Sequence, residues 1–103
     1  MKINYPIIKS LSFLGVKIVV YDGYYLSQET DLKDFENVVC YDENDLILWK
    51  IHGAKESGHW LDHDSFTNVG VHENDDCVAT SFSGHVFNVD IKTGEASYKR
   101  FVK

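Results

Sequence analysis

The residues best suited to chemistry are the histidines and carboxylates gathered between positions 52 and 64. His59 and His63 are four residues apart, and in a helix this spacing places two imidazoles on one face, where they could bind zinc. Gly53 and Gly58 disfavour a long helix there, and the stretch contains no cysteine. We therefore expect a polar loop rather than a metal centre, and the sequence implies no cofactor.

The sequence also lacks the short motifs that define common catalytic sites. It contains no Gly-Xaa-Ser-Xaa-Gly elbow, no glycine-rich phosphate loop and no His-Glu-Xaa-Xaa-His pair. Acid–base pairs such as Asp62 with His63 can be assembled from almost any sequence of this composition. Since general acid–base catalysis needs a base positioned beside an acid or an electrophile, we predict that the chain is not an enzyme.

The same stretch, residues 52–64, is better suited to binding a partner. It is a long loop in a chain whose other turns are short, and long loops are often functional. It carries Trp60, an aromatic residue of the kind that anchors protein interfaces, although the ring could equally fold back and cap the core. Tyr24 and Tyr25 form a second aromatic candidate with the same two alternatives. The predicted partner-binding residues are Glu56, His59, Trp60, Asp62, His63, Asp64, Tyr24 and Tyr25.

The charge balance indicates which kind of partner such a surface fits. Sixteen acidic residues against ten basic ones give a formal net charge of −6. This balance disfavours nucleic acid as the direct partner and favours a basic protein, although an acidic surface can also serve solubility alone. The turns 42–45 and 73–76 add carboxylates to the same negative field.

Hydropathy and cysteine usage predict a cytoplasmic protein. No stretch of about 18 apolar residues is present, so we expect no membrane span. The N-terminal residues lack the long apolar region of a secretory signal. Cys40 and Cys77 each fall inside a predicted strand, and without export we expect buried thiols rather than a disulfide.

Strands are the elements that must position these residues. Apolar and polar residues alternate over 13–21, and turn signals recur about every ten residues in the second half of the chain. Pro6 assigns the first strand to a sheet edge, and Thr30 can cap a short helix. The expected elements are strands at 3–9, 13–21, 38–41, 46–51, 66–71, 77–82, 85–91 and 96–102, and a short helix at 31–36. Two apolar faces are also expected, one from Leu14, Val16, Ile18 and Val20, the other from Ile47, Trp49 and Ile51.

The predicted fold is mainly β: an antiparallel meander forming a twisted sheet, a sandwich or a partial barrel, with at most one short helix. The length fits one domain, residues 1–103. The C-terminal hairpin of the chain resembles the strand and turn pattern of β-propeller blades of the quinoprotein and WD type. The chain has room for two such blades, too few for a closed propeller. The matching residues are Gly84, Val86, Asp90, Thr93 and Gly94.

A second resemblance concerns function and covers the C-terminal two-thirds of the chain. It is carried by Leu48-Trp49-Lys50-Ile51, by residues 64–69 and by the hairpin at 84–95. In these segments the chain resembles small bacterial toxin antidotes, in particular the immunity proteins of contact-dependent growth inhibition systems. This resemblance implies a protein that binds a nuclease-type toxin domain tightly and covers its active site.

Two functional hypotheses follow. In the first, the chain is an immunity protein for a basic ribonuclease toxin; Asp62 and Asp64 pair with cationic side chains of the toxin while Trp60 supplies buried area. In the second, the chain is a small structural or adaptor domain that self-associates through an exposed edge strand.

Overall fold

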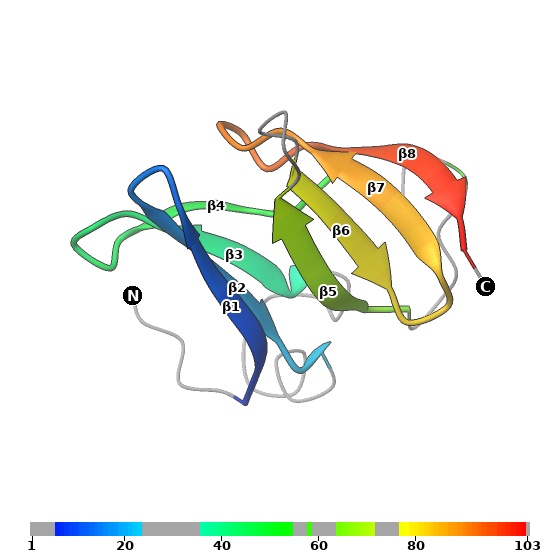
Figure 1. Ribbon diagram of the computed structural model, residues 1–103, viewed down its shortest axis with the longest axis horizontal. Coiled ribbons are helices and arrows are strands. Elements are labelled where there is room, and N and C mark those ends of the chain that lie inside the picture. Colours follow the sequence, from blue (N-terminus) through cyan, green and yellow to red (C-terminus); the bar gives the residue numbers. More distant parts are fainter. Residues whose placement is uncertain (1–5, 24–35, 55–57, 59–63, 72–76, 103) are drawn as a thin grey trace.

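The computed structural model describes residues 6–23, 36–54, 58, 64–71 and 77–102 (Figure 1). These residues form eight strands in two four-stranded antiparallel sheets, with the strand orders β1-β2-β3-β4 and β5-β6-β7-β8. Each sheet is thus a simple meander, as expected from regularly spaced turns. The strands are β1 (Ile7–Phe13), β2 (Val16–Tyr21), β3 (Val38–Tyr41), β4 (Ile47–Lys50), β5 (Phe66–Val71), β6 (Cys77–Ser81), β7 (His85–Val89) and β8 (Ala96–Phe101).

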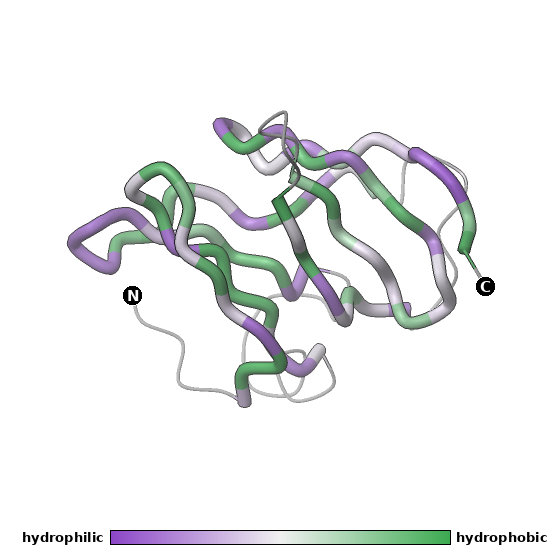
Figure 2. The backbone as a smooth tube through the Cα atoms, viewed as in Figure 1, coloured by the Kyte–Doolittle hydropathy of each residue, from purple (hydrophilic) through white to green (hydrophobic). Residues whose placement is uncertain are grey.

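The two sheets pack against each other through one shared hydrophobic core. Phe66 and Phe87 of the C-terminal sheet meet edge to face within it, with ring centroids 5.8 Å apart. Figure 2 shows hydrophobic residues along β2 and β3 and hydrophilic ones at the turn between β3 and β4. The mainly-β prediction is confirmed, and the arrangement is a β-sandwich. The core side chains are Ile18, Val20, Val38, Cys40, Trp49 and Ile51 from the N-terminal sheet and its continuation, and Phe66, Val69, Cys77, Ala79, Phe87, Val89 and Ala96 from the C-terminal one.

The central strands β2 and β3 are buried on both faces. On the face away from the shared core, Val19, Tyr21, Val39 and Tyr41 form a second buried cluster. The hydroxyls of Tyr21 and Tyr41 share a hydrogen bond of 2.6 Å, which satisfies two polar atoms that burial removes from water. Burial, followed by that hydrogen bond, raises the pKa of the Tyr21 hydroxyl.

The structure corrects the first two predicted strands. The predicted strand 13–21 is wrong at its start, because Leu14 and Gly15 adopt φ angles of 51° and 81° and form a two-residue hairpin loop. Leu14 is therefore 71% exposed instead of belonging to the buried face. The first strand was predicted at 3–9; in the described residues it runs over Ile7–Phe13, four residues beyond the predicted end, and residues 3–5 lie outside the described part of the chain. Its place at a sheet edge is confirmed, and Pro6 lies just before it, where its missing N–H costs no ladder bond.

A second correction concerns the apolar face of the fourth strand. The pairing of β3 with β4 slips by one residue, so that Trp49 lies opposite Cys40 while Ile47 lies opposite Tyr41. Cys40 and Tyr41 point to opposite faces, and this irregularity places Ile47 on the face opposite Trp49. Ile47 is 41% exposed for this reason, and the prediction that it shares a face with Trp49 was wrong.

Asn37 links the two sheets. Its side-chain amide donates to the carbonyl oxygens of Tyr21 and Phe66, both at 2.7 Å, and its Oδ1 accepts the Phe66 N–H at 3.0 Å. This fully buried side chain thus joins the end of β2 to the start of β5. Such a buried amide stabilises the sandwich because all three hydrogen bonds are made.

A second link joins the end of β4 to the turn between β7 and β8. The Trp49 indole N–H donates to the Ile91 carbonyl at 2.8 Å, and His52 pairs by backbone hydrogen bonds with Gly94 and Ala96. Gly94 has a φ of +80°, and a Cβ there would lie 2.6 Å from the Trp49 ring, so only glycine fits.

The buried-thiol prediction is confirmed, since Cys40 and Cys77 are both buried and free. Burial raises the pKa of each thiol to about 11, and the proximity of Cys40 adds to the effect on Cys77. The short helix predicted at 31–36 lies outside the described residues except for Glu36. No helix in the described part of the chain has the length and apolar composition to cross a bilayer.

Candidate protein-binding surface

Most of the residues predicted to contact a partner lie outside the described part of the chain. These are Tyr24, Tyr25, Glu56, His59, Trp60, Asp62 and His63. Their assignment to a binding surface stays a prediction from the sequence. His59 and His63, the two residues weighed as zinc ligands, are among them.

Asp64 is described, and its position argues for a structural role. It is 5% exposed, and its two carboxylate oxygens accept the N–H and the hydroxyl of Ser83 at 3.1 and 2.5 Å. Asp64 therefore fixes the turn between β6 and β7. A carboxylate that is nearly inaccessible and already bonded to Ser83 is poorly placed to pair with a cationic partner, so the proposed interface does not use Asp64.

Exposed carboxylates gather instead at the turn between β3 and β4. Asp42 holds this turn, because its Oδ1 accepts the N–H groups of Asn44 and Leu46 at 2.8 and 3.0 Å. Asp45 lies in the left-handed region with a φ of 62°, a conformation that aspartate tolerates. Glu43 and Asp45 are consequently presented to solvent on a well-defined turn.

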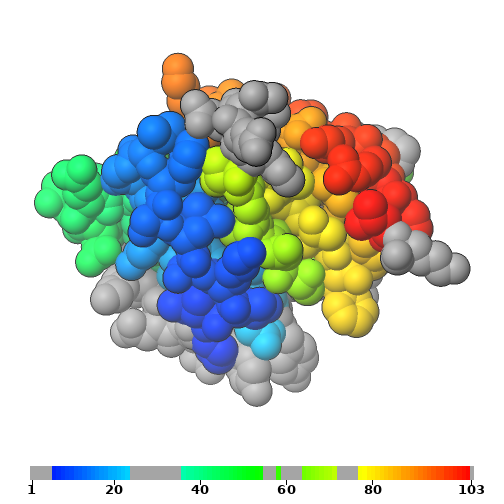
Figure 3. All heavy atoms as spheres, in the orientation of Figure 1, coloured from blue at the N-terminus to red at the C-terminus, as the bar shows by residue number. Residues whose placement is uncertain are grey.

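The hairpin between β1 and β2 lies beside this turn. A Cβ on Gly15 would lie 3.4 Å from Glu43 Oε1, and Lys17 Nζ is 3.7 Å from Asp45 Oδ1. Both partners of that ion pair are about half exposed, so it contributes little to stability. Figure 3 shows the two tips side by side, β3–β4 in green and β1–β2 in blue. An open hollow of about 310 Å³ between them is lined by Ser12, Gly15, Val16, Lys17, Asp42, Glu43 and Asp45.

Large aliphatic side chains are exposed on the same two tips. Leu14 occupies the β1–β2 loop, and three consecutive residues that begin at Leu46 lead from the acidic turn into β4. Exposed apolar groups next to charges are typical of protein-binding surfaces. We call this surface the acidic end and define it by Leu14, Lys17, Asp42, Glu43, Asp45, Leu46, Ile47 and Leu48.

The charged groups of the acidic end are of two kinds. Its ionisable groups are three carboxylates and one ammonium, without a histidine or a cysteine. No group of three or more histidine, cysteine, aspartate or glutamate side chains within the described residues could hold a metal ion.

Only part of this surface could be predicted from the sequence. The carboxylates of the 42–45 turn were expected, but Leu14 was expected on the face of Val16 and Ile18, and Ile47 on the face of Trp49. The Leu14-Gly15 pair before Val16 was the signal for a hairpin, since glycine readily adopts the positive φ that such loops require.

Fold and surface together define an antiparallel β-sandwich domain with an acidic surface that carries exposed aliphatic groups. Residues 1–101 match the model of a domain family of unknown function, DUF7957, and the chain belongs to this family. No curated protein and no solved structure is significantly similar to the chain.

Proposed function

We propose that the chain is an immunity protein, which binds a basic nuclease toxin in the cytoplasm and neutralises it by covering the active site. The observation that carries the proposal is the acidic end. There, two adjacent hairpin tips present three carboxylates together with four exposed aliphatic side chains.

The acidic end offers a nuclease both negative charge and apolar area. A nuclease holds phosphates in a cationic cleft, and carboxylates on a protruding tip complement such a cleft. Charge accelerates the encounter, but charged pairs alone give modest affinity because both partners lose their hydration. The leucines at positions 14, 46 and 48 supply apolar area that association removes from water.

Trp60 and Asp62, in the loop at 52–64, are further proposed contacts with the toxin. Both stay predictions from the sequence. The acidic end does not depend on them, and the variants below test the acidic end alone.

The proposal is tested by two variants with the same change of charge. Glu43→Lys alters the acidic end, whereas the control Glu95→Lys alters an exposed residue at the turn between β7 and β8. We expect Glu43→Lys to weaken binding to the cognate toxin at least tenfold and to abolish growth rescue on co-expression. Glu95→Lys should retain both.

Calorimetric titration of each variant with the toxin domain provides the measurement. Equal affinities for the two variants would exclude the acidic end as the binding surface. A complete lack of binding by the unaltered chain to toxins encoded beside its gene would exclude the immunity function itself.

A further inference from the structure

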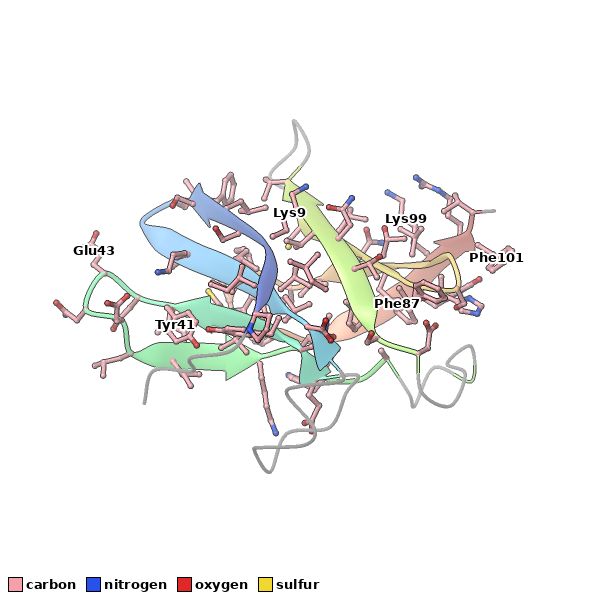
Figure 4. The ribbon with its side chains drawn as sticks, turned by 90° about the horizontal axis from the view of Figure 1, so that it is seen from below. Lys9, Tyr41, Glu43, Phe87, Lys99 and Phe101 are labelled. Carbon is pink, nitrogen blue, oxygen red and sulfur yellow. The ribbon has the colours of Figure 1, made fainter. Side chains whose placement is uncertain are left out.

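Exposed hydrophobic side chains gather at two opposite ends of the molecule. The described residues include nine large hydrophobics that are exposed, of which four lie at the acidic end and three, Phe82, Phe101 and Val102, lie together at the other end. Figure 4 places Glu43 at one extremity and Phe101 at the other. The proposed function uses the acidic end and leaves this second surface unexplained.

The second surface is built on a line of aromatic rings that leads out of the core. Tyr98 contacts the buried Phe87 at a centroid distance of 5.4 Å. His85 follows at 5.7 Å from Tyr98, and Phe101 at 5.0 Å from His85. The surface is therefore supported from beneath by the core. We call it the aromatic end and define it by Phe82, His85, Tyr98, Lys99, Arg100, Phe101 and Val102.

Phe82 is held in its exposed position by a well-bonded turn. Its side chain is 82% exposed, while its N–H donates to the Ser65 carbonyl at 2.8 Å. Ser83 is fixed by Asp64, and the Ser81 hydroxyl accepts the His85 N–H at 3.2 Å. Because the backbone that carries the exposed ring is fixed, binding through Phe82 costs little backbone freedom, and an exposed aromatic ring is a favourable interface anchor.

The aromatic end is positively charged within an acidic protein. Lys99 and Arg100 are exposed on the edge strand β8, where Arg100 lies opposite Val86 and so points to the other face of the strand from Phe101. Neither 77–89 nor 96–102 contains an acidic residue, and the nearby carboxylate of Asp64 is buried against Ser83. The acidic end carries the complementary pattern, three carboxylates with aliphatic groups. The chain thus displays two surfaces of opposite charge that both expose apolar side chains.

We propose that the aromatic end binds the acidic end of a second copy of the chain. The contact is head to tail, so each added copy leaves one acidic and one aromatic end free. Phe82 and Phe101 cover the leucines of the acidic end, while Lys99 and Arg100 face Glu43 and Asp45. This self-association goes beyond the proposed function and involves no toxin.

Two variants, each altered at one end by exposed residues only, test this contact. Phe82→Ser/Arg100→Gln disables the aromatic end, and Glu43→Gln/Leu48→Ser disables the acidic end. Sedimentation velocity of the full chain should show a mean mass that rises with concentration and falls as salt is added. Each variant alone should lose this rise and stay monomeric.

Mixing the two variants gives the decisive result. Each retains the end that the other lacks, so the mixture should form one-to-one dimers that grow no further. A monomeric unaltered chain at every concentration, or a mixture that does not associate, would overturn the proposal. A dimer that survives in either variant alone would mean another interface, such as pairing through an edge strand. Toxin binding by Phe82→Ser/Arg100→Gln reports on the proposed function separately.

Discussion

At the scale of single residues, the sandwich depends on a few buried polar groups whose hydrogen bonds are complete. Asn37 is the clearest example, because one side chain joins the backbones of Tyr21 and Phe66. Only an amide can donate two hydrogen bonds and accept one at this position. Asn37 should therefore contribute more to the free energy of unfolding than any exposed asparagine does.

We therefore expect Asn37→Ala to lower the free energy of unfolding by about 2–4 kcal/mol, since buried backbone groups lose their partner. Asn88→Ala, at an exposed position on β7, should change it by less than about 0.5 kcal/mol. Urea unfolding of both variants gives the comparison. If both midpoints shift equally, Asn37 does not join the sheets as described.

The buried thiols predict how stability depends on pH. Cys40 and Cys77 have a pKa of about 11 in the folded chain against an ordinary value of 9.0. Well below pH 9.0 both states hold neutral thiols, so stability is unaffected by them. As the pH rises from there, the unfolded thiols ionise first and the unfolded state is favoured, by up to about 1.4 kcal/mol per pH unit for each thiol.

Comparison with a Cys40→Ala/Cys77→Ala variant isolates this effect. The unaltered chain should lose stability between pH 9.0 and about 11 more steeply than the variant. Chemical denaturation at each pH gives the free energy of unfolding of both proteins. If the two values change equally with pH, the thiols ionise as readily in the folded chain as in the unfolded one.

At the scale of elements, the hairpin between β1 and β2 carries a strained residue, Leu14, on the proposed binding surface. Leu14 adopts a positive φ that is unfavourable for a leucine, yet its side chain is exposed at the acidic end. Asparagine tolerates this conformation and is preferred in such loops. A substitution at Leu14 is therefore expected to change stability and binding in opposite directions.

Leu14→Asn should raise the free energy of unfolding by about 0.5–1 kcal/mol through relief of backbone strain. The same variant should bind the toxin more weakly, because it lacks an apolar group of the interface. Thermal unfolding and calorimetric titration of one sample measure both. A variant that is more stable and binds unchanged would remove Leu14 from the interface.

The elements also show where prediction from the sequence succeeds and where it fails. Alternation over 13–21 and the regular spacing of turn residues located seven of the eight strands to within about three residues, because alternation records which side chains are buried and turn residues mark where strands end. It failed at Leu14, where the apolar pattern continued through a turn, and at Ile47, where an irregular pairing moved the side chain to the other face. Asn37 could not be foreseen, since its partner Phe66 is distant in sequence.

At the scale of the whole molecule, charge is unevenly distributed. Although the net charge is −6, the chain has an acidic end with exposed leucines and an aromatic end that carries Lys99 and Arg100. A binding protein benefits from this separation, because each surface selects its partner by both charge and apolar area. The β-sandwich keeps the two ends apart and holds each on turns fixed by side-chain hydrogen bonds.

The central claim is that the chain neutralises a toxin by occupying its surface. The most direct measurement is the nuclease activity of the cognate toxin during titration with the purified chain. We expect activity to fall linearly and to vanish at one equivalent, with the inhibition weakened at high salt. Full activity at several equivalents would contradict the claim, as would inactivation of many toxin molecules by one chain.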